Sequence, residues 1–306
     1  MGGMPACQRP DRPGVSVVIP AFNEEAVIER CLLAVLDQTV AAEQIIVVDN
    51  GSTDGTGAVV TRVQRQHPES PIIVVQQNLE QGLVPTRNFG LNSATADVLG
   101  RIDADSVLAP QWVEQVQQAF LDPGVAAATG PVAYDDMPLR RLGLRLDDAG
   151  RRLALRLAPD RYPMLYGSNM AIRRCAWEEI RSTVCRDEAD EMHEDLDLTL
   201  HLGEHGLRIA YVPAMVAGVS ARRLDDVPED FRYYVNRFDR TCRAHQVDSP
   251  ALKAPAVMLR SLYRPLKLLR AMHPSSGPGP HTGSASLAVD RHKVTTGAHR
   301  HPGYST

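Results

Sequence analysis

The sequence predicts an α/β protein built on a doubly wound, mostly parallel sheet with helices on both faces and further helices at the C-terminal end. The first half of the chain alternates short apolar runs with segments of helical periodicity. The runs are Val15–Pro20, Ile45–Asp49, Pro71–Gln76 and Asp97–Asp103. Strands that are apolar throughout are buried on both faces, as in a parallel sheet covered by helices.

The segments between these runs have helical spacing. After Asn23, a residue suited to cap a helix, apolar side chains recur at helical intervals from Val27 to Leu36. We expect further helices at Gly57–His67 and Leu83–Ser93. The second half predicts strands at Val125–Thr129 and Ile209–Val212, and helices at Trp177–Arg181 and Glu194–Glu204, with Gly206 ending the last one.

Composition sets limits on the class of protein. The chain has 306 residues, of which 43% are hydrophobic, and a formal charge of −4, so we expect no general nucleic-acid binding. No apolar run approaches the roughly 18 residues of a membrane-spanning helix, and Met1–Pro13 lacks the apolar core of a signal peptide. The five cysteines are odd in number and form no CxxC pair, which argues against a disulfide framework or a zinc site. We therefore expect a cytoplasmic protein.

Polar clusters follow three of the predicted strands at the point where each strand ends. They are Pro20-Ala-Phe-Asn-Glu-Glu25, Asp49-Asn-Gly-Ser-Thr-Asp54 and Asp103-Ala-Asp105. Taken singly, Asn23 and Asp54 could cap helices and Asp103 could be a surface acid. Ligands of open α/β sheets bind beyond the carboxyl ends of the strands, so three such clusters at one edge favour a binding site.

Asp103 and Asp105 stand one residue apart at the end of a strand, which suits a hard divalent cation. Mg²⁺ and Mn²⁺ prefer oxygen ligands and often take one or two carboxylates together with the phosphates of a substrate. Arg87 and Asn88 precede this strand, and a guanidinium there is suited to a phosphate or a nucleobase. The alternative for Arg87 is a solvated helix face.

Six motifs in this order resemble the family 2 glycosyltransferases. They are Val17–Glu25, Ile46–Thr56, Arg87–Gly90, Asp103–Asp105, Gly167–Ile172 and Glu194-Asp195. Together they extend over about two-thirds of the chain. The resemblance implies a GT-A fold, a nucleotide-sugar donor (a UDP-, GDP- or dTDP-sugar), Mn²⁺ or Mg²⁺ as cofactor, and inversion at the anomeric carbon.

The resemblance also implies a role for individual residues. The donor would be bound by residues of the first four motifs: Pro20, Ala21, Asn23, Glu24, Asp49, Asn50, Ser52, Asp54, Arg87, Asp103 and Ala104. Asp49 would lie against the base, Arg87 near the base or diphosphate, and Asp103 and Asp105 at the metal. Gly167, Ser168, Asn169 and Glu194 would face the donor sugar and acceptor, and Asp195 would be the catalytic base. Glu191 and Glu194 are its nearest rivals.

We divide the chain on this basis. We expect a flexible N-terminus at 1–13 and a GT-A catalytic domain at 14–220, with a nucleotide-binding half at 14–106 and an acceptor half at 107–220. A helical segment follows at 221–272, and a disordered tail rich in Pro, Gly, Ser, Thr and His at 273–306. The Gln/Arg-x-x-Arg-Trp motif of processive members is absent, because both tryptophans precede Asp195, so we expect transfer of a single sugar.

Two basic amphipathic segments bear on the acceptor. Met137–Pro159 and Leu252–Arg270 each place a stripe of basic residues beside a stripe of leucines. Such helices lie on anionic membranes, which would make the acceptor a lipid or lipid-linked saccharide and put the protein at the inner face of the cell membrane. The alternative is that the leucines pack on the catalytic domain.

Two other functions remain open at this stage. A sugar nucleotidyltransferase also combines a Rossmann-like sheet with acidic metal ligands, but it would carry a Gly-rich basic loop where this chain has Ala-Phe-Asn-Glu-Glu. A non-catalytic nucleotide-sugar-binding protein would have no need of Asp103, Asp105 and Asp195 together. Both are weaker than the glycosyltransferase interpretation.

Overall fold

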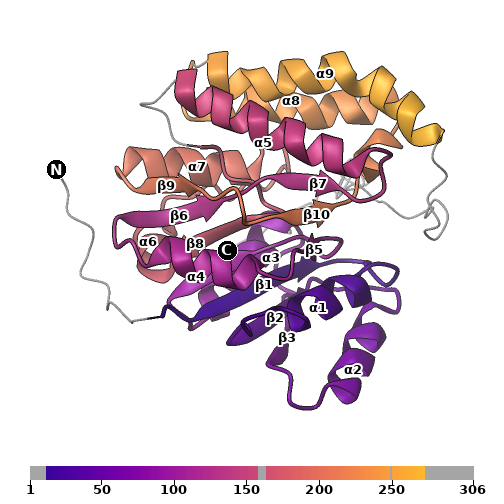
Figure 1. The fold of residues 1–306 in the computed structure, drawn as a ribbon, viewed down its shortest axis with the longest axis vertical. Coiled ribbons are helices and arrows are strands. Elements are labelled where there is room, and N and C mark those ends of the chain that lie inside the picture. The colour runs from indigo at the N-terminus through magenta and orange to yellow at the C-terminus, as the bar shows by residue number, and fades with distance from the viewer. Residues whose placement is uncertain (1–11, 158–162, 249, 273–306) are drawn as a thin grey trace, which may run out of the picture.

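The computed structural model describes residues 12–157, 163–248 and 250–272, which form an α/β fold around a seven-stranded sheet (Figure 1). The strand order is β3-β2-β1-β4-β8-β6-β9. The strands are β1 Val15–Ala21, β2 Gln44–Asp49, β3 Ile72–Gln76, β4 Val98–Arg101, β6 Val125–Thr129, β8 Met170–Arg173 and β9 Arg208–Tyr211. The six strands predicted from apolar runs are all present.

The sheet is parallel except at β8. This strand pairs antiparallel with both β4 and β6, whereas β3, β2, β1 and β4 pair in parallel, as do β6 and β9. The sequence pattern does not reveal β8, because four residues directly before a helix carry too short an alternation. The predicted mostly parallel sheet is therefore confirmed, with one antiparallel strand inserted between β4 and β6.

Helices cover both faces of the sheet. On one face lie α1 (Ile28–Leu36), α2 (Thr56–Gln66) and α4 (Trp112–Phe120), which share one buried apolar cluster. On the other lie α3 (Leu83–Ser93), α6 (Arg174–Ile180) and α7 (Glu194–Glu204), which share a second cluster. Each cluster has a fully buried tryptophan, Trp112 or Trp177. Gly90 lets α3 approach the sheet, because a Cβ there would overlap Val18 and Val48.

A smaller sheet of three strands adjoins the carboxyl ends of the large one. Its order is β5-β10-β7, with β5 at Val107–Leu108, β7 at Val132–Tyr134 and β10 at Ala217–Val219. A short 3-10 helix, η1 (Arg222–Leu224), follows β10 directly. Strand β5 begins two residues after Asp105, and β10 leads through η1 into the C-terminal helices.

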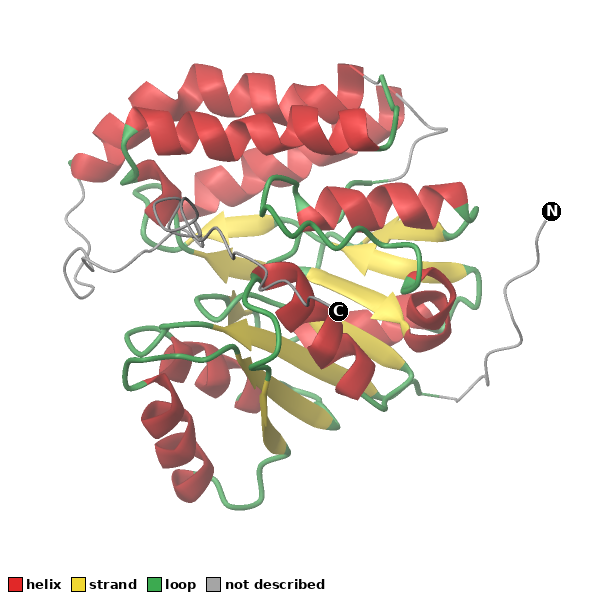
Figure 2. Cartoon of the chain, turned by 180° about the vertical axis from the view of Figure 1, so that it is seen from behind, coloured by secondary structure: helices red, strands yellow, loops and turns green. Residues whose placement is uncertain are grey.

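Three longer helices form a layer at one end of the molecule, seen from behind in Figure 2. They are α5 (Arg140–Leu157), α8 (Pro228–Ala244) and α9 (Pro250–Ala271). Helices α8 and α9 pack on one another through a third apolar cluster that includes Phe231 and Tyr263. No helix in the described ranges is long and apolar enough to cross a membrane. The tail predicted at 273–306 and residues 1–11 lie outside the described part of the chain.

Candidate active site

The loops that follow β1 and β2 are joined by hydrogen bonds at the carboxyl edge of the sheet. The backbone N–H of Asn23 donates to Ser52 Oγ (3.0 Å), and Asn23 Oδ1 accepts from the N–H of Thr53 (2.8 Å). Asn23 has a φ of 55°, a left-handed conformation that asparagine tolerates. The expectation that Asn23 caps α1 is wrong, because that helix begins at Ile28 and its N-cap position is Val27.

Asp49 and Asn50 shape the wall of this edge at the end of β2. Asp49 accepts hydrogen bonds from the N–H of Ser52 (3.0 Å) and from Gln76 Nε2 (3.2 Å). Asn50 is buried, and its amide bonds Gln77 O, Glu80 O and the N–H of Gly82, while its own N–H donates to Ala21 O beside Pro20. Asn50 therefore fixes the loop after β3.

Asp54 lies at the beginning of α2. One of its carboxylate oxygens accepts from the N–H of Thr56 (3.0 Å), and the other from the N–H of Glu25 (3.1 Å). These bonds lower the pKa of Asp54 in spite of partial burial. The carboxylate thereby joins the loop after β1 to the first turn of α2. Asp54 thus lies at the start of a helix, as its possible capping role in the sequence suggests.

Three carboxylates and one guanidinium gather where β1 and β4 end. Arg222 of η1 makes a two-pronged contact with Glu24 (3.0 and 2.9 Å), and its Nε lies 3.2 Å from Asp105. Asp103 lies next to them, half-exposed, and the intervening Ala104 is buried. Nothing in the sequence pattern singles out Arg222, because the topology, rather than a motif, returns the chain to this edge after β10.

The chemistry of this group fits a divalent metal. Burial raises the pKa of Asp105 to about 6, and the negative charges of Asp103 and Glu24 add to that effect, against the lowering influence of Arg222. A cation relieves such crowding of carboxylates, and oxygen-only ligands suit Mn²⁺ or Mg²⁺. Asp103 and Asp105, the predicted ligands, are therefore placed at a site with the right donor chemistry.

Glu194, in the first turn of α7, is held between two buried arginines. Its carboxylate contacts Arg87 Nη1 at 2.7 Å and Arg101 Nη1 at 3.0 Å, and Arg101 also contacts Asp103 at 2.8 Å. Burial alone would favour the neutral acid, but Arg101 and Arg87 lower the pKa of Glu194. Arg87 is 0% exposed and also bonds Asn88, so a contact with nucleobase or diphosphate does not fit its position.

Asp195, the next residue, faces a different environment. It is half-buried and accepts hydrogen bonds from the N–H of Gly167 (3.2 Å) and of Leu196 (2.8 Å). Burial and the neighbouring charge of Glu194 raise its pKa to about 7. Gly167 has to be glycine, because a Cβ there would overlap Arg101 and Glu194. The resulting carboxylate is suited to exchange a proton near neutral pH.

The loop before β8 is anchored by Asn169. Its side chain is fully buried and bonds Trp112 Nε1 (2.7 Å), Pro131 O (3.0 Å) and Met215 O (2.8 Å). These bonds join α4, the loop before β7 and the segment before β10. Asn169 is thus directed into the protein, and Gly167 is also buried, so that of these three loop residues only Ser168 is partly exposed.

Residues 16–181 match the family model described as "Glycosyl transferase family 2". The chain belongs to this family of glycosyl-transfer enzymes. Among curated proteins it is 32% identical over 124 residues to the glycosyltransferase AglE of Haloferax volcanii, a stretch that covers 40% of each chain. It is 26% identical over 276 residues to an N-acetylglucosaminyltransferase of Rhizobium meliloti, covering 86% of this chain and 59% of the relative. The chain thus spans about half the length of these curated relatives.

Solved structures agree on the GT-A fold. A mannosyltransferase from Pyrobaculum calidifontis, in complex with GDP-Man and Mn²⁺, superposes with a TM-score of 0.57 at 21% identity, covering 88% of this chain and 76% of that one. Glucosyl-3-phosphoglycerate synthase from Mycobacterium tuberculosis, in complex with UDP, gives 0.52 at 21% identity, with coverages of 78% and 82%. The predicted family, enzyme class and fold are confirmed.

Proposed function

We propose that this glycosyltransferase moves one sugar from a nucleotide-sugar donor to an acceptor hydroxyl with inversion, assisted by Mn²⁺ or Mg²⁺. The observation that carries the proposal is Asp195. It is a half-buried carboxylate whose pKa is raised to about 7, and two backbone N–H groups donate hydrogen bonds to it. The three carboxylates of Glu24, Asp103 and Asp105 lie at the same edge of the sheet. A base tuned to the working pH is what a single displacement requires.

The donor lies, in this proposal, along the loops after β1, β2 and β4. Asn23, Glu24, Ser52 and Asp49 form its nucleotide side. Asp103 and Asp105 would hold the metal, which supplies neutralisation of charge on the departing diphosphate. The GDP-Man and UDP named in the titles of the two solved structures support a purine or pyrimidine nucleoside diphosphate, so UDP-, GDP- and dTDP-sugars are the donors to test.

Asp195 would take the proton of the acceptor hydroxyl as the oxygen attacks the anomeric carbon from the face opposite the diphosphate. The N–H groups of Gly167 and Leu196 hold its carboxylate in one orientation, which spares reorganisation during the reaction. Arg87 and Arg101 would act indirectly, by neutralising Glu194 and so fixing the first turn of α7. Glu194 cannot serve as base while both arginines occupy its oxygens.

Transfer of a single sugar and the domain division 14–220 and 221–272 remain part of the proposal. The processive motif is missing after Asp195. The C-terminal segment begins with η1, whose Arg222 reaches Glu24 and Asp105, so it would complete the donor site rather than stand apart from it.

Of the two predicted stripes of leucines, the one on α5 is the more exposed. The leucines predicted on α9 lie in the apolar cluster that α9 shares with α8, and Arg260 pairs with Asp239 of α8 at 2.9 Å. On α5, Leu142, Leu146 and Leu153 are 49%, 64% and 55% exposed, next to the exposed Arg141 and Arg145. We propose this face as the contact with an anionic bilayer, which would favour a lipid-linked acceptor.

The test of the function is donor hydrolysis by the purified chain. UDP-, GDP- and dTDP-sugars are incubated with Mn²⁺ or Mg²⁺, and the released nucleoside diphosphate is measured. One donor should be hydrolysed slowly and only with metal, and Asp105→Ala should abolish that release. Failure of every donor with either metal, at protein concentrations that detect one turnover per hour, would contradict the proposal.

A further inference from the structure

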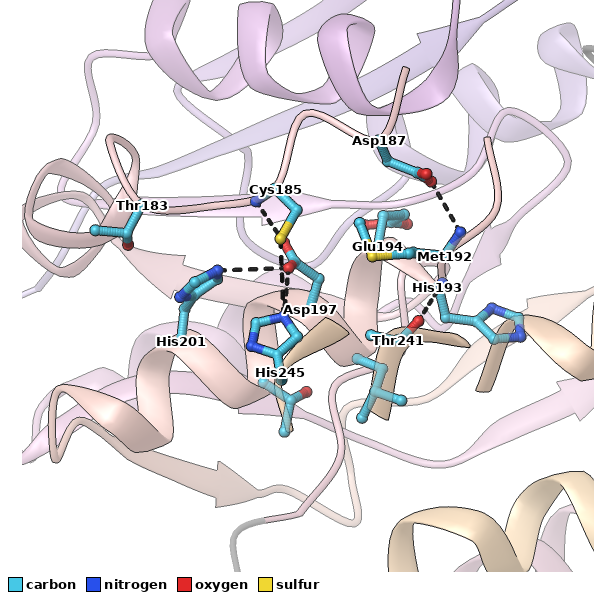
Figure 3. Close-up of polar contacts among 12 residues, drawn as sticks. Thr183, Cys185, Asp187, Met192, His193, Glu194, Asp197, His201, Thr241 and His245 are labelled. Atoms are coloured by element: carbon cyan, nitrogen blue, oxygen red, sulfur yellow. Dashed lines mark hydrogen bonds and ion pairs between the residues drawn. The ribbon is translucent and has the colours of Figure 1, made fainter. Parts of the chain in front are cut away.

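Four side chains with metal-ligating atoms come together where α7 meets the end of α8, away from Asp103 and Asp105. They are Cys185 in the loop before α7, Asp197 and His201 on α7, and His245 at the end of α8. One ligand atom from each lies within 4.8 Å of all the others. Figure 3 shows the four side chains turned toward one another. Three separate segments of chain therefore contribute to one cluster, called here the Cys185 cluster.

The separations within the Cys185 cluster are close to those of a tetrahedral zinc site. Asp197 Oδ1 lies 3.4 Å from His201 Nε2 and 2.8 Å from His245 Nε2, and Cys185 Sγ lies 3.9 Å from His245 Nε2. Zinc bonds of about 2.0–2.3 Å at tetrahedral angles separate ligand atoms by roughly 3.3–3.7 Å. Shifts of about 1 Å or less at the side-chain tips would bring all four atoms to these distances.

A fifth residue orients both imidazoles for this purpose. Glu204 lies 3.0 Å from His201 Nδ1 through one carboxylate oxygen and 3.4 Å from His245 Nδ1 through the other. Metal-binding histidines almost always give their second nitrogen to a carboxylate or carbonyl, which fixes the tautomer and the ring orientation. With Nδ1 of both rings on Glu204, both Nε2 atoms face Asp197 and Cys185.

Asp197 is oriented so that only one of its carboxylate oxygens faces the cluster. Its Oδ2 accepts the backbone N–H of Cys185 at 3.2 Å, while Oδ1 faces the two Nε2 atoms. Its side chain is 3% exposed, so little water reaches it. Hydrogen bonding alone leaves the cluster incomplete, because the buried Nε2 of His201 makes no hydrogen bond among the described residues and only approaches Asp197 Oδ1 at 3.4 Å. A buried nitrogen without a partner is costly, and a metal ion would satisfy it.

We infer that the Cys185 cluster binds one structural Zn²⁺. One thiolate, two imidazoles and one carboxylate are the ligands that zinc prefers, whereas Mg²⁺ and Mn²⁺ prefer oxygen alone. Four protein ligands leave no open position for a substrate, which assigns the ion to structure and not to chemistry. This inference departs from the sequence-based expectation of no zinc site, which rests on CxxC pairs and does not consider a site that uses one cysteine and is assembled by the fold.

The position of the cluster gives the ion a purpose. It joins α7 to the end of α8 and to the loop before α7, and the first turn of α7 carries Glu194 and Asp195. Two residues of the cluster, Asp197 and His201, follow Asp195 on the same helix, so holding them in place limits the movement of Asp195 relative to Gly167. The inference is independent of the proposed sugar transfer, because it concerns only the metal content and stability of the folded chain.

Metal analysis of the purified full chain tests the inference. The chain, stripped by dialysis against a strong chelator, is titrated with Zn²⁺ against a chromophoric competitor. The wild type should bind one Zn²⁺ tightly and melt at a higher temperature once it is loaded, because a ligand that binds only the folded state stabilises it. His201→Gln should lose this binding by more than about 100-fold, as expected for removal of a direct ligand.

Two further variants separate loss of a ligand from loss of the fold. Glu204→Gln keeps all four ligands and should weaken Zn²⁺ binding by about 10–100-fold, as other orienting carboxylates do. His205→Gln, next in the chain and bonded to Glu179 instead, should bind like the wild type. If the stripped wild type takes up no Zn²⁺, or if His201→Gln and Glu204→Gln bind it as tightly as His205→Gln, the inference is wrong.

Cobalt substitution provides the last check on ligand identity. Co²⁺ bound to a thiolate gives a charge-transfer absorption that oxygen and nitrogen ligands do not. The wild type loaded with Co²⁺ should show this band, and Cys185→Ser should lose it while the spectrum of a tetrahedral ion remains. An identical band in Cys185→Ser would place the ion elsewhere in the chain and overturn the assignment.

Discussion

Glu194 and Asp195 are adjacent in the first turn of α7, yet the pKa values of their carboxyl groups are shifted in opposite directions. Arg101 and Arg87 lower the pKa of Glu194 against the effect of its burial, and burial together with the charge of Glu194 raises the pKa of Asp195 to about 7. One carboxylate is thus locked in the ionised form while the other can exchange a proton. Pairs separated in this way indicate which group does acid–base chemistry.

Asp195→Asn is the variant that tests the base. The amide keeps the size of the side chain but cannot accept a proton, so transfer should fall by about 10²–10⁴-fold. Donor binding should persist, since Asp105 and Asp49 are unchanged. Initial rates and donor affinity are measured together. Glu191→Gln, which alters a partly exposed acid four residues before Asp195, serves as control and should have little effect. Near wild-type transfer by Asp195→Asn would show that another group is the base.

The pH profile should follow the same group. The base must be ionised, so kcat/KM should rise with pH, reach half its maximum near pH 7, the value to which the pKa of Asp195 is raised, and level off above that pH. The stability sign is opposite: the folded chain binds this proton more tightly than the unfolded chain does, so Asp195 makes stability fall as pH rises from about 4 to 7. Denaturant unfolding of Asp195→Asn should show a weaker fall over that range. If the dependence of stability on pH is the same in Asp195→Asn as in the wild type, Asp195 is not the group with the raised pKa.

Glu194→Gln should destabilise the fold and shift the pH profile without removing the base. The substitution leaves the buried guanidiniums of Arg87 and Arg101 without their counter-charge. Loss of one partner of a buried ion pair costs about 3–5 kcal/mol. Denaturant unfolding should report a loss of this order, while the pH at which kcat/KM levels off should move downward, because the charge that helps to raise the pKa of Asp195 is gone. A variant as stable as the wild type would contradict the role given to Glu194.

Much of this architecture follows from the sequence because its causes are local. The strands from Val15 to Asp49 are apolar throughout, and helix α7 ends before Gly206, whose φ of 66° suits glycine. The candidate acids Asp103, Asp105 and Asp195 can be named from the sequence because each lies in a contiguous motif.

What the sequence leaves hidden depends on contacts between distant residues. Arg101 sits inside an apolar strand and pairs with Glu194, 93 positions later. Arg222 reaches Glu24 across almost 200 positions. The Cys185 cluster unites three segments, none of which has ligand spacing typical of a zinc motif. The positions of Asn169 and Arg87 also depend on distant contacts. Both belong to the motifs, but their side chains are buried against Trp112 and Glu194.

Vesicle cosedimentation tests the exposed face of α5. The wild type should pellet with anionic vesicles and less so at high salt, because exposed charges are screened beyond about 10 Å at 0.1 M salt. Leu146→Ser combined with Leu153→Ser should reduce pelleting, since both side chains are exposed. Leu262→Ser on α9, another exposed leucine, is the control and should pellet like the wild type. If the wild type does not pellet with anionic vesicles, the membrane proposal is wrong.

Asp105→Ala tests the metal site at its most buried carboxylate. The side chain is 8% exposed, and Arg222 contacts it at 3.2 Å. Removing a direct ligand should abolish the increase in nucleoside-diphosphate affinity that Mn²⁺ gives the wild type, which calorimetry measures with UDP and GDP. Asp122→Asn, a surface acid paired with Arg208, should keep that increase. Because Zn²⁺ at the Cys185 cluster uses different ligands, the zinc content of Asp105→Ala should equal that of the wild type. Mn²⁺-dependent binding that survives in Asp105→Ala would mean that the diphosphate and its metal are held elsewhere.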